Sequence, residues 1–253
     1  MSFFSRLRSA SSGIHKDVGT LPFLQRYHSD ELRLIDHYLH LCQLLPLYEM
    51  LEQKLKNPAV TIKLPDEMYF LLERSEELRK DIQFLENKIP PEYKKRVCKS
   101  THDYEEFLKN CQDERVIYGH FLARILGDLF GGQRIRARLK ERYVTWEMTT
   151  LDSDQGLAFY TFPDGVLRDL LRLLNKENKP DNADDQVIID AVKDGIARHI
   201  PIFNELELDR ERYRDLPKNV HLCGLFSGRN ALAAGIAALG VASVAYLYSR
   251  QPN

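Results

Sequence analysis

Apolar residues recur at three- and four-residue spacing along most of the chain, which predicts an all-α fold. The predicted helices span residues 30–56, 67–88, about 113 to beyond 132, 166–174 and 187–208. Ser29 or Asp30 is expected to cap the first of them, and Pro46 to kink or interrupt it. Valine and isoleucine are sparse and no stretch alternates cleanly, so strands are not expected. Polar or proline-containing connections are predicted at 57–65, 88–104 (as loops or short helices) and 175–186.

The stretch from His120 to Gln133, HFLARILGDLFGGQ, departs from an ordinary amphipathic helix. It keeps helical apolar spacing although each glycine inside a helix costs about 1 kcal/mol relative to alanine. Gly127 and Gly131 share one helical face, where the missing Cβ atoms would let a flat ligand approach the backbone. Arg124 and Asp128 are predicted to pair beside that face. Two other interpretations stay open: a helix C-cap followed by a loop, and close packing between helices.

Composition narrows the class of protein further. A chain of 253 residues is expected to form one domain, or one domain with an appendage. The net charge of −1 gives no overall attraction to nucleic acid, so no nucleic-acid partner is expected. The four cysteines form no CxxC pair and no zinc-binding spacing, which is typical of a reducing compartment. No phosphate-binding GxxxxGK[ST] or GxGxxG motif is present.

The C-terminal segment predicts a membrane anchor. Residues 231–248 contain no charge, lie between Arg229 and Arg250, and are just long enough to cross a bilayer. We therefore predict a helical domain over 1–208, a charged linker over 209–228 and an anchor over 229–250; an alanine-rich packing helix is the alternative for the last. The N-terminus lacks a secretory signal and, although rich in Arg and Ser like a transit peptide, is expected to fold with the domain. The domain would then face the cytosol from an intracellular membrane, or be cytoplasmic if the tail does not insert.

Four segments resemble one protein family. LGDLFGGQ (Leu126–Gln133) is similar to the signature LGDLSGGQ of the distal helix of heme oxygenases. Three further segments match the family in the same order and spacing: IHKDVGTLPFLQRY (14–27), LYEMLEQKL (47–55) and GLAFYTFP (156–163). The resemblance spans most of the chain from Phe4 to about Glu207. It implies a single-domain heme-oxygenase-like helical bundle, with heme between a proximal helix and a kinked, glycine-rich distal helix.

The resemblance also implies an activity. Heme oxygenases open heme to biliverdin, ferrous iron and CO, using O2 and electrons from an NADPH-linked reductase or a ferredoxin. Heme is both cofactor and substrate. The rival hypotheses are a membrane-anchored heme-binding or heme-sequestering protein with weak or no oxygenase activity, and an all-α adaptor whose glycines serve packing only.

The resemblance implies functional roles for the residues at matching positions. His15 matches the axial ligand of the heme iron, although most lone histidines are structural. Asp128 matches the catalytic carboxylate that acts through water, oriented by Arg124 and by Tyr48, which could otherwise be a core tyrosine. The backbone at the three glycines is expected to lie against the porphyrin: Gly127, Gly131 and Gly132.

Other basic residues are implied to bind the carboxylates of heme or an electron donor. The positions matching propionate-binding residues are Arg8, Arg168 and Arg172. The run after the glycines is either a solvated helix face or a docking site for an acidic donor: Arg134, Arg136, Arg138, Lys140 and Arg142. The chain departs from the family pattern at three positions: Phe130 for serine, Gly19 for glutamate and Leu122 for tyrosine. Phe130 could crowd the distal pocket or point away and pack between helices.

Overall fold

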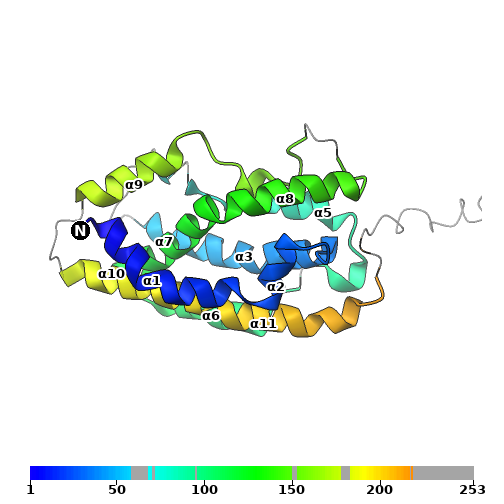
Figure 1. Ribbon diagram of the computed structural model, residues 1–253. Coiled ribbons are helices and arrows are strands. Elements are labelled where there is room, and N and C mark those ends of the chain that lie inside the picture. Colours follow the sequence, from blue (N-terminus) through cyan, green and yellow to red (C-terminus); the bar gives the residue numbers. More distant parts are fainter. Residues whose placement is uncertain are drawn as a thin grey trace, which may run out of the picture.

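The computed structural model describes residues 1–57, 68–69, 72–94, 96–149, 153–177, 183–216 and 218, and this part of the chain is helical without strands (Figure 1). The α-helices are α1 (Phe3–Gly19), α2 (Pro22–Gln25), α3 (Leu34–Leu55), α5 (Ser75–Glu86), α6 (Lys99–Asn110), α7 (Glu114–Phe130), α8 (Gly132–Thr145), α9 (Val166–Glu177), α10 (Ala183–Ala197) and α11 (His199–Asp209). Short 3-10 turns join them: η1 (Arg26–His28), η2 (Pro91–Tyr93), η3 (Ala158–Tyr160) and η4 (Arg210–Tyr213). The all-α prediction is confirmed.

Helix α3 runs through the middle of the bundle and is buried along most of its length (Figure 1). It begins at Leu34 rather than at Asp30, and the residue before it, Arg33, is the N-cap and donates its N–H to Asp36 at 3.0 Å. Of the two effects predicted for Pro46, a kink or an interruption, the interruption is wrong, because the helix continues through Pro46 to Leu55. A proline inside a helix costs about 3 kcal/mol. Burial of the apolar side chains on both sides of Pro46 offsets this cost.

Several predicted boundaries differ from those observed. The predicted helix 67–88 is observed as α5 from Ser75 to Glu86, and of its earlier residues 67, 70 and 71 lie outside the described ones. The predicted helix 187–208 is two helices, α10 and α11, which meet at Arg198. The first half of helix α6 lies inside the stretch 88–104 that was predicted as a loop or short helices. Its buried stripe consists of only Thr101, Tyr104 and Leu108, so its polar composition hid the helical spacing.

Helices α7 and α10 pack closely at glycines that the sequence did not single out. A Cβ atom at Gly119 would lie 2.5 Å from the Cβ of Ala191 and 2.7 Å from the carbonyl oxygen of Ile188. A Cβ atom at Gly195 would lie 3.0 Å from that of Ala123. Glycine is therefore required here by helix–helix contact. The packing interpretation applies to Gly119 and Gly195 rather than to the face of Gly127.

The chain after Asp209 still packs against the domain. The Tyr213 side chain is buried, its hydroxyl donates to Asp36 at 3.0 Å, and its carbonyl oxygen accepts from Arg33 at 2.7 Å. The predicted linker 209–228 thus begins with an ordered turn; its remainder beyond 218 and the predicted anchor 229–250 lie outside the described residues. Within the described residues, no helix is long and apolar enough to cross a membrane.

Four of the histidines that the structure describes are buried in the core, and their burial predicts sensitivity to acid. The Tyr27 hydroxyl lies 3.0 Å from Nδ1 of His37 and 2.9 Å from Nδ1 of His40, and the Tyr104 hydroxyl lies 2.7 Å from Nδ1 of His120. Burial lowers the pKa of His37 to about 3 and that of His120 to about 4. It also lowers the pKa values of His40 and His199 well below the ordinary value.

Stability should therefore fall as the pH falls. Histidines of the unfolded chain take up protons below about pH 6.5 while the buried ones stay neutral, so each contributes a loss of about 1.4 kcal/mol per pH unit. Asp81 opposes this trend, because burial raises the pKa of its carboxyl to about 6. We expect His120→Gln to reduce the slope of unfolding free energy against pH by about 1.4 kcal/mol per unit between about pH 6 and 4.5. Urea denaturation at several pH values measures this slope. The same change at exposed His102 should leave it unaltered, and an unaltered slope in His120→Gln would refute the explanation.

Candidate functional site

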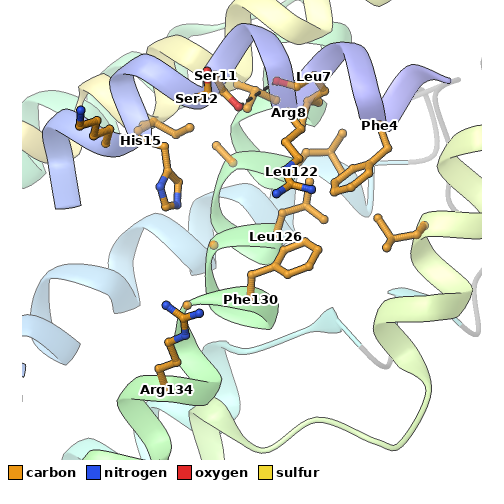
Figure 2. Close-up of a pocket in the computed structure, with 17 residues that line it drawn as sticks. Phe4, Leu7, Arg8, Ser11, Ser12, His15, Leu122, Leu126, Phe130 and Arg134 are labelled. Atoms are coloured by element: carbon orange, nitrogen blue, oxygen red, sulfur yellow. Dashed lines mark hydrogen bonds between the residues drawn. The ribbon is translucent and has the colours of Figure 1, made fainter. Parts of the chain in front are cut away.

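A cavity of about 630 Å³ lies between α1 and α7 (Figure 2). This volume is in the range of sites for small organic ligands and cofactors. Helices α9 and α10 complete its walls, which are mainly apolar. The residues lining it are Phe4, Leu7, Arg8, Ser11, Ser12, His15, Lys16, Leu122, Ala123, Leu126, Gly127, Phe130, Gly131, Arg134, Leu171, Val192 and Ile196.

One wall comes from a single face of α1. Phe4, Leu7, Ser11 and His15 follow one another at three- and four-residue spacing, so they lie on one side of the helix. The His15 ring points into the cavity from this face (Figure 2). The sequence predicted His15 but missed its companions, although their helical spacing was visible. An exposed imidazole in an apolar cavity is well suited to bind a metal centre carried by a ligand.

The opposite wall is the glycine face of α7. A Cβ atom at Gly127 would meet nothing within 4 Å, and both Gly127 and Gly131 line the cavity. The predicted bare helical face therefore borders the cavity. Gly132 does not line it, since a Cβ atom there would lie 2.8 Å from the Tyr160 ring. Two of the three predicted glycines thus form the site, while Gly132 allows a close contact between the start of α8 and η3.

Asp128, Arg124 and Tyr48 form a buried cluster behind the glycine face. Nη2 of Arg124 lies 3.0 Å from both carboxylate oxygens of Asp128, and the Tyr48 hydroxyl donates to Oδ2 of Asp128. The predicted pairing of Arg124 with Asp128 is confirmed. The Asp128 side chain faces this cluster and does not line the cavity, although it follows Gly127 in the chain. Any contact of its carboxyl with a ligand would have to pass through water.

Burial controls the proton affinity of this cluster. It raises the pKa of the Asp128 carboxyl, although Arg124 and the hydroxyl of Tyr48 act in the opposite direction. Burial also raises the pKa of Tyr48 well above its ordinary value, so the phenol stays a hydrogen-bond donor. The pKa of Arg124 is lowered by burial but raised more strongly by Asp128 and Tyr48, with a net upward shift. The cluster combines a permanent cation with a carboxyl whose proton affinity is increased.

The GLAFYTFP segment holds this cluster in place. The carboxylate of Asp81 accepts the N–H groups of Ala158 at 2.9 Å and Phe159 at 2.8 Å. The Phe159 ring contacts the Tyr48 ring edge-on, with centroids 5.5 Å apart. Gln133, at the end of the glycine motif, donates to the carbonyl oxygen of Tyr160 at 3.0 Å. Two motifs about 30 residues apart in sequence therefore meet in space. Asp81 of α5, which binds the GLAFYTFP segment, was not among the residues predicted from the sequence.

The basic residues predicted to bind carboxylates are not all at the cavity. Arg8 lines it, but Arg168 and Arg172 do not, and their side chains are 81% and 73% exposed. Oδ1 of Asp169 lies 3.5 Å from Nε of Arg168 and 2.8 Å from Nη2 of Arg172. The apolar stripe of α9 faces the core, so its basic residues face solvent, and only Leu171 reaches the cavity. The structure does not bring Arg168 and Arg172 to the site.

The three departures from the family pattern occupy different places. Phe130 lines the cavity and stacks on Phe4, with ring centroids 5.9 Å apart and planes at 18°. Of the two orientations that the sequence left open, Phe130 takes the one toward the cavity. Leu122 is fully buried in its wall. Gly19 ends α1 outside the cavity, where its carbonyl oxygen accepts from Gln25.

Comparison with known proteins gives the family. The heme oxygenase family model matches residues 1–205. The structure of heme oxygenase-1 from the cyanobacterium Synechocystis in complex with heme superimposes with a TM-score of 0.70 at 20% identity, covering 85% of this chain and 96% of that chain. Heme oxygenase from Leptospira interrogans gives a TM-score of 0.66 at 26% identity, covering 81% of this chain and all of its own (100%). No curated protein sequence matches. The chain belongs to the heme oxygenase family, whose members are oxidoreductases that degrade heme.

Proposed function

We propose that this protein binds heme in the cavity between α1 and α7 and opens it to biliverdin, ferrous iron and CO. O2 and electrons from an NADPH-linked reductase or a ferredoxin would be consumed. The observation that carries the proposal is the pairing of opposite walls: His15 projects from α1, and the bare backbone at Gly127 and Gly131 faces it from α7. An imidazole on one side and a flat, side-chain-free surface on the other suit a porphyrin.

The residues present fit heme. The described residues hold no group of three or more His, Cys, Asp or Glu that could bind a metal ion, so a metal centre there would have to arrive with its own ligands. A porphyrin supplies four nitrogen ligands and needs one axial histidine. The lining is mainly apolar, as the ring requires, and its charged members are all basic, as the propionates require: Arg8, Lys16 and Arg134.

The buried cluster behind Gly127 would supply the proton chemistry. Bound heme supplies the iron centre that activates O2. Burial raises the pKa of the Asp128 carboxyl above its ordinary value, which favours the protonated form that a proton donor needs. Arg124 and Tyr48 fix the orientation of that carboxyl through the three contacts described above. Since Asp128 does not line the cavity, it would pass its proton through a water molecule. This cluster favours an oxygenase over a heme-sequestering protein, which has no need of a buried acid at this position.

The glycine face offers a test that separates ligand binding from folding. We expect Gly127→Leu to weaken hemin binding at least about 100-fold, because its side chain would fill the space of the ligand. The variant should fold normally, since nothing lies within 4 Å of the new Cβ and leucine favours helix by about 1 kcal/mol. Titration with hemin, followed by Soret absorbance, gives the affinity.

A matched control is Gly13→Leu. Gly13 lies on α1, also has free space around its Cβ position and does not line the cavity. It should bind hemin with the affinity of the unaltered protein. Unchanged hemin affinity in Gly127→Leu would place the ligand elsewhere.

We also propose that an acidic electron donor docks on the basic residues of α8, but not equally on all residues of the predicted run. Arg138 is half-exposed, and within the described part of the chain its one ion pair is with Glu141 on its own helix, at 3.0 Å. Arg136 and Lys140 both contact Asp154, and Arg142 binds Asp30, so part of their charge is neutralised within the domain. Arg138 is therefore the strongest docking residue of the run, and complementary charge would mainly raise the association rate.

We also propose that residues 229–250 anchor the domain to an intracellular membrane with its active site facing the cytosol. The support is the uncharged stretch 231–248 between two arginines, which is long enough to cross a bilayer. Without insertion, the protein would be cytoplasmic.

A further inference from the structure

Two aromatic side chains join the walls of the cavity at one end. The ring of Phe4, on α1, stacks on the ring of Phe130, on α7, with centroids 5.9 Å apart and planes at 18°. His15 lies about three helical turns further along α1, which is about 16 Å along the helix axis. In Figure 2 His15 lies to the left of α7 and the Phe4–Phe130 pair to its right. The cavity therefore has an imidazole toward one end and a stacked aromatic pair at the other.

Phe130 stands beside the bare face of α7 rather than on it. Successive residues of a helix point about 100° apart. Measured from the midpoint between Gly127 and Gly131, Phe130 therefore lies about 80° to one side, and Asp128 lies about 80° to the other. The contacts agree with this geometry, since Phe130 lines the cavity while Asp128 faces its buried partners. A flat ligand on the glycine face would have an aromatic ring at one flank and the buried carboxyl cluster behind the other.

The first turn of α1, which carries Phe4, is held by the fold. The side chain of Phe3 is buried, and the N–H of Phe4 donates to Oδ1 of Asn175 on α9 at 3.3 Å. The guanidinium of Arg6 binds the carboxylate of Asp185 on α10. Three contacts to other parts of the domain thus fix this turn. The ring of Phe4 belongs to an ordered wall and keeps its place against Phe130.

A ring bound only through His15 and the glycine face keeps one rotational freedom. The imidazole fixes the centre of the ring, but the bare backbone at Gly127 and Gly131 offers no side chain that could stop rotation within the plane. Charge alone does not select one orientation, because Arg8 and Arg134 lie at different ends of the cavity (Figure 2). A bulky side-chain pair at the rim can select it through shape.

We propose that the Phe4–Phe130 pair fixes the in-plane orientation of the bound ring and thereby determines which of its edges is cleaved. The inference rests on the proposed function, because heme is the ring concerned. The edges of heme carry different substituents, so a rim of definite shape rejects orientations that a bare helix face would accept equally. The serine of the family pattern would leave this end of the cavity open. The pair thus sets specificity through shape and takes no part in proton transfer.

The test reads the orientation of heme without turnover. In the ferric cyanide complex of the full chain, the hyperfine-shifted heme-methyl proton resonances form a separate set for each in-plane orientation. We expect one dominant set in the unaltered protein, and in Phe130→Ser a second set with at least about a quarter of the total intensity. Phe4→Leu should have the same effect, because a stack needs both rings. Leu208→Ser is the matched control: its side chain is 76% exposed on α11, outside the cavity, and its loss should leave one dominant set.

Turnover gives a second readout, since the ratio of biliverdin isomers from Phe130→Ser should follow the ratio of the two orientations. A single orientation in Phe130→Ser, identical to that of the unaltered protein, would overturn the inference and leave the proposed function intact. Two equally populated orientations in the unaltered protein would overturn it as well. So would an isomer ratio that stays fixed while the orientations redistribute. Failure of the unaltered protein to bind hemin at all would reject the proposed function itself.

Discussion

Replacing Asp128 with asparagine should lower the rate of biliverdin formation at least about 100-fold while changing heme affinity less than about threefold. General acid catalysis by one positioned group contributes about 10² to 10⁴ in rate, and the amide cannot donate a carboxyl proton. Heme affinity should persist because Asp128 does not line the cavity. The measurement pairs a hemin titration with initial rates of biliverdin formation at saturating heme.

Asparagine keeps the shape of the side chain, so the fold should survive. Its carboxamide oxygen can still accept from Arg124 or Tyr48, which limits the loss of stability. Asp103→Asn is the control, because that acid is exposed and pairs only with Lys99 on the surface of α6. A variant at Asp128 that keeps the full rate would reject the proton-donating role and leave the buried cluster as a structural feature.

Replacing His15 with alanine should change the absorption spectrum of the heme complex and weaken binding. Among the described residues, His15 is the only histidine that lines the cavity. Its removal therefore leaves no imidazole there to bind the iron. We expect the Soret band to shift toward that of water-ligated or free hemin, and heme turnover to fall at least about 100-fold. Because the His15 side chain projects into open space, added imidazole should enter and restore the original spectrum in part.

The rescue by imidazole separates ligation from structural damage. A protein that had merely lost its fold would not regain its spectrum with imidazole. His28→Ala is the matched control, since His28 is exposed in η1 and lies outside the cavity. An unchanged Soret band in His15→Ala would exclude this residue as the axial ligand.

Local spacing predicted those parts of the site that lie on single helices. The i, i+4 relation placed Arg124 beside Asp128, and the bare positions Gly127 and Gly131 on one face. Both relations depend only on helix geometry, which is the same in every fold. The family motifs added His15 and Tyr48, whose positions depend on contacts between helices and could not be obtained from spacing.

The sequence-based predictions failed where contacts between distant parts of the chain determine whether a residue is buried or exposed. Arg168 and Arg172 share a helical face as predicted, but the apolar stripe of α9 turns that face to solvent. Gly119 is required by a neighbouring helix about 70 residues away in the chain, which no local pattern can show. Asp81 lies in a polar stretch of α5 and is buried only because η3 folds over it.

Phe130, which replaces the serine of the family pattern, lies where it can affect heme turnover directly. Its ring lies at the cavity and stacks on Phe4 of α1, so it closes one side of the site through a contact between α7 and α1. The side chain remains 47% exposed, which leaves apolar surface available to a bound ring. An aromatic group there suits stacking or edge contact with a flat ligand better than the serine of the family pattern would.

The most direct test of heme cleavage is a single-turnover experiment on the full chain with hemin, a reductant and air. Catalase should be present, so that free hydrogen peroxide cannot degrade heme without the enzyme. We predict that the Soret band decays while the broad biliverdin band rises in the red, with one CO released per heme. A stable Soret band under these conditions, with a suitable reductase supplied, would contradict the oxygenase activity and leave a heme-binding protein.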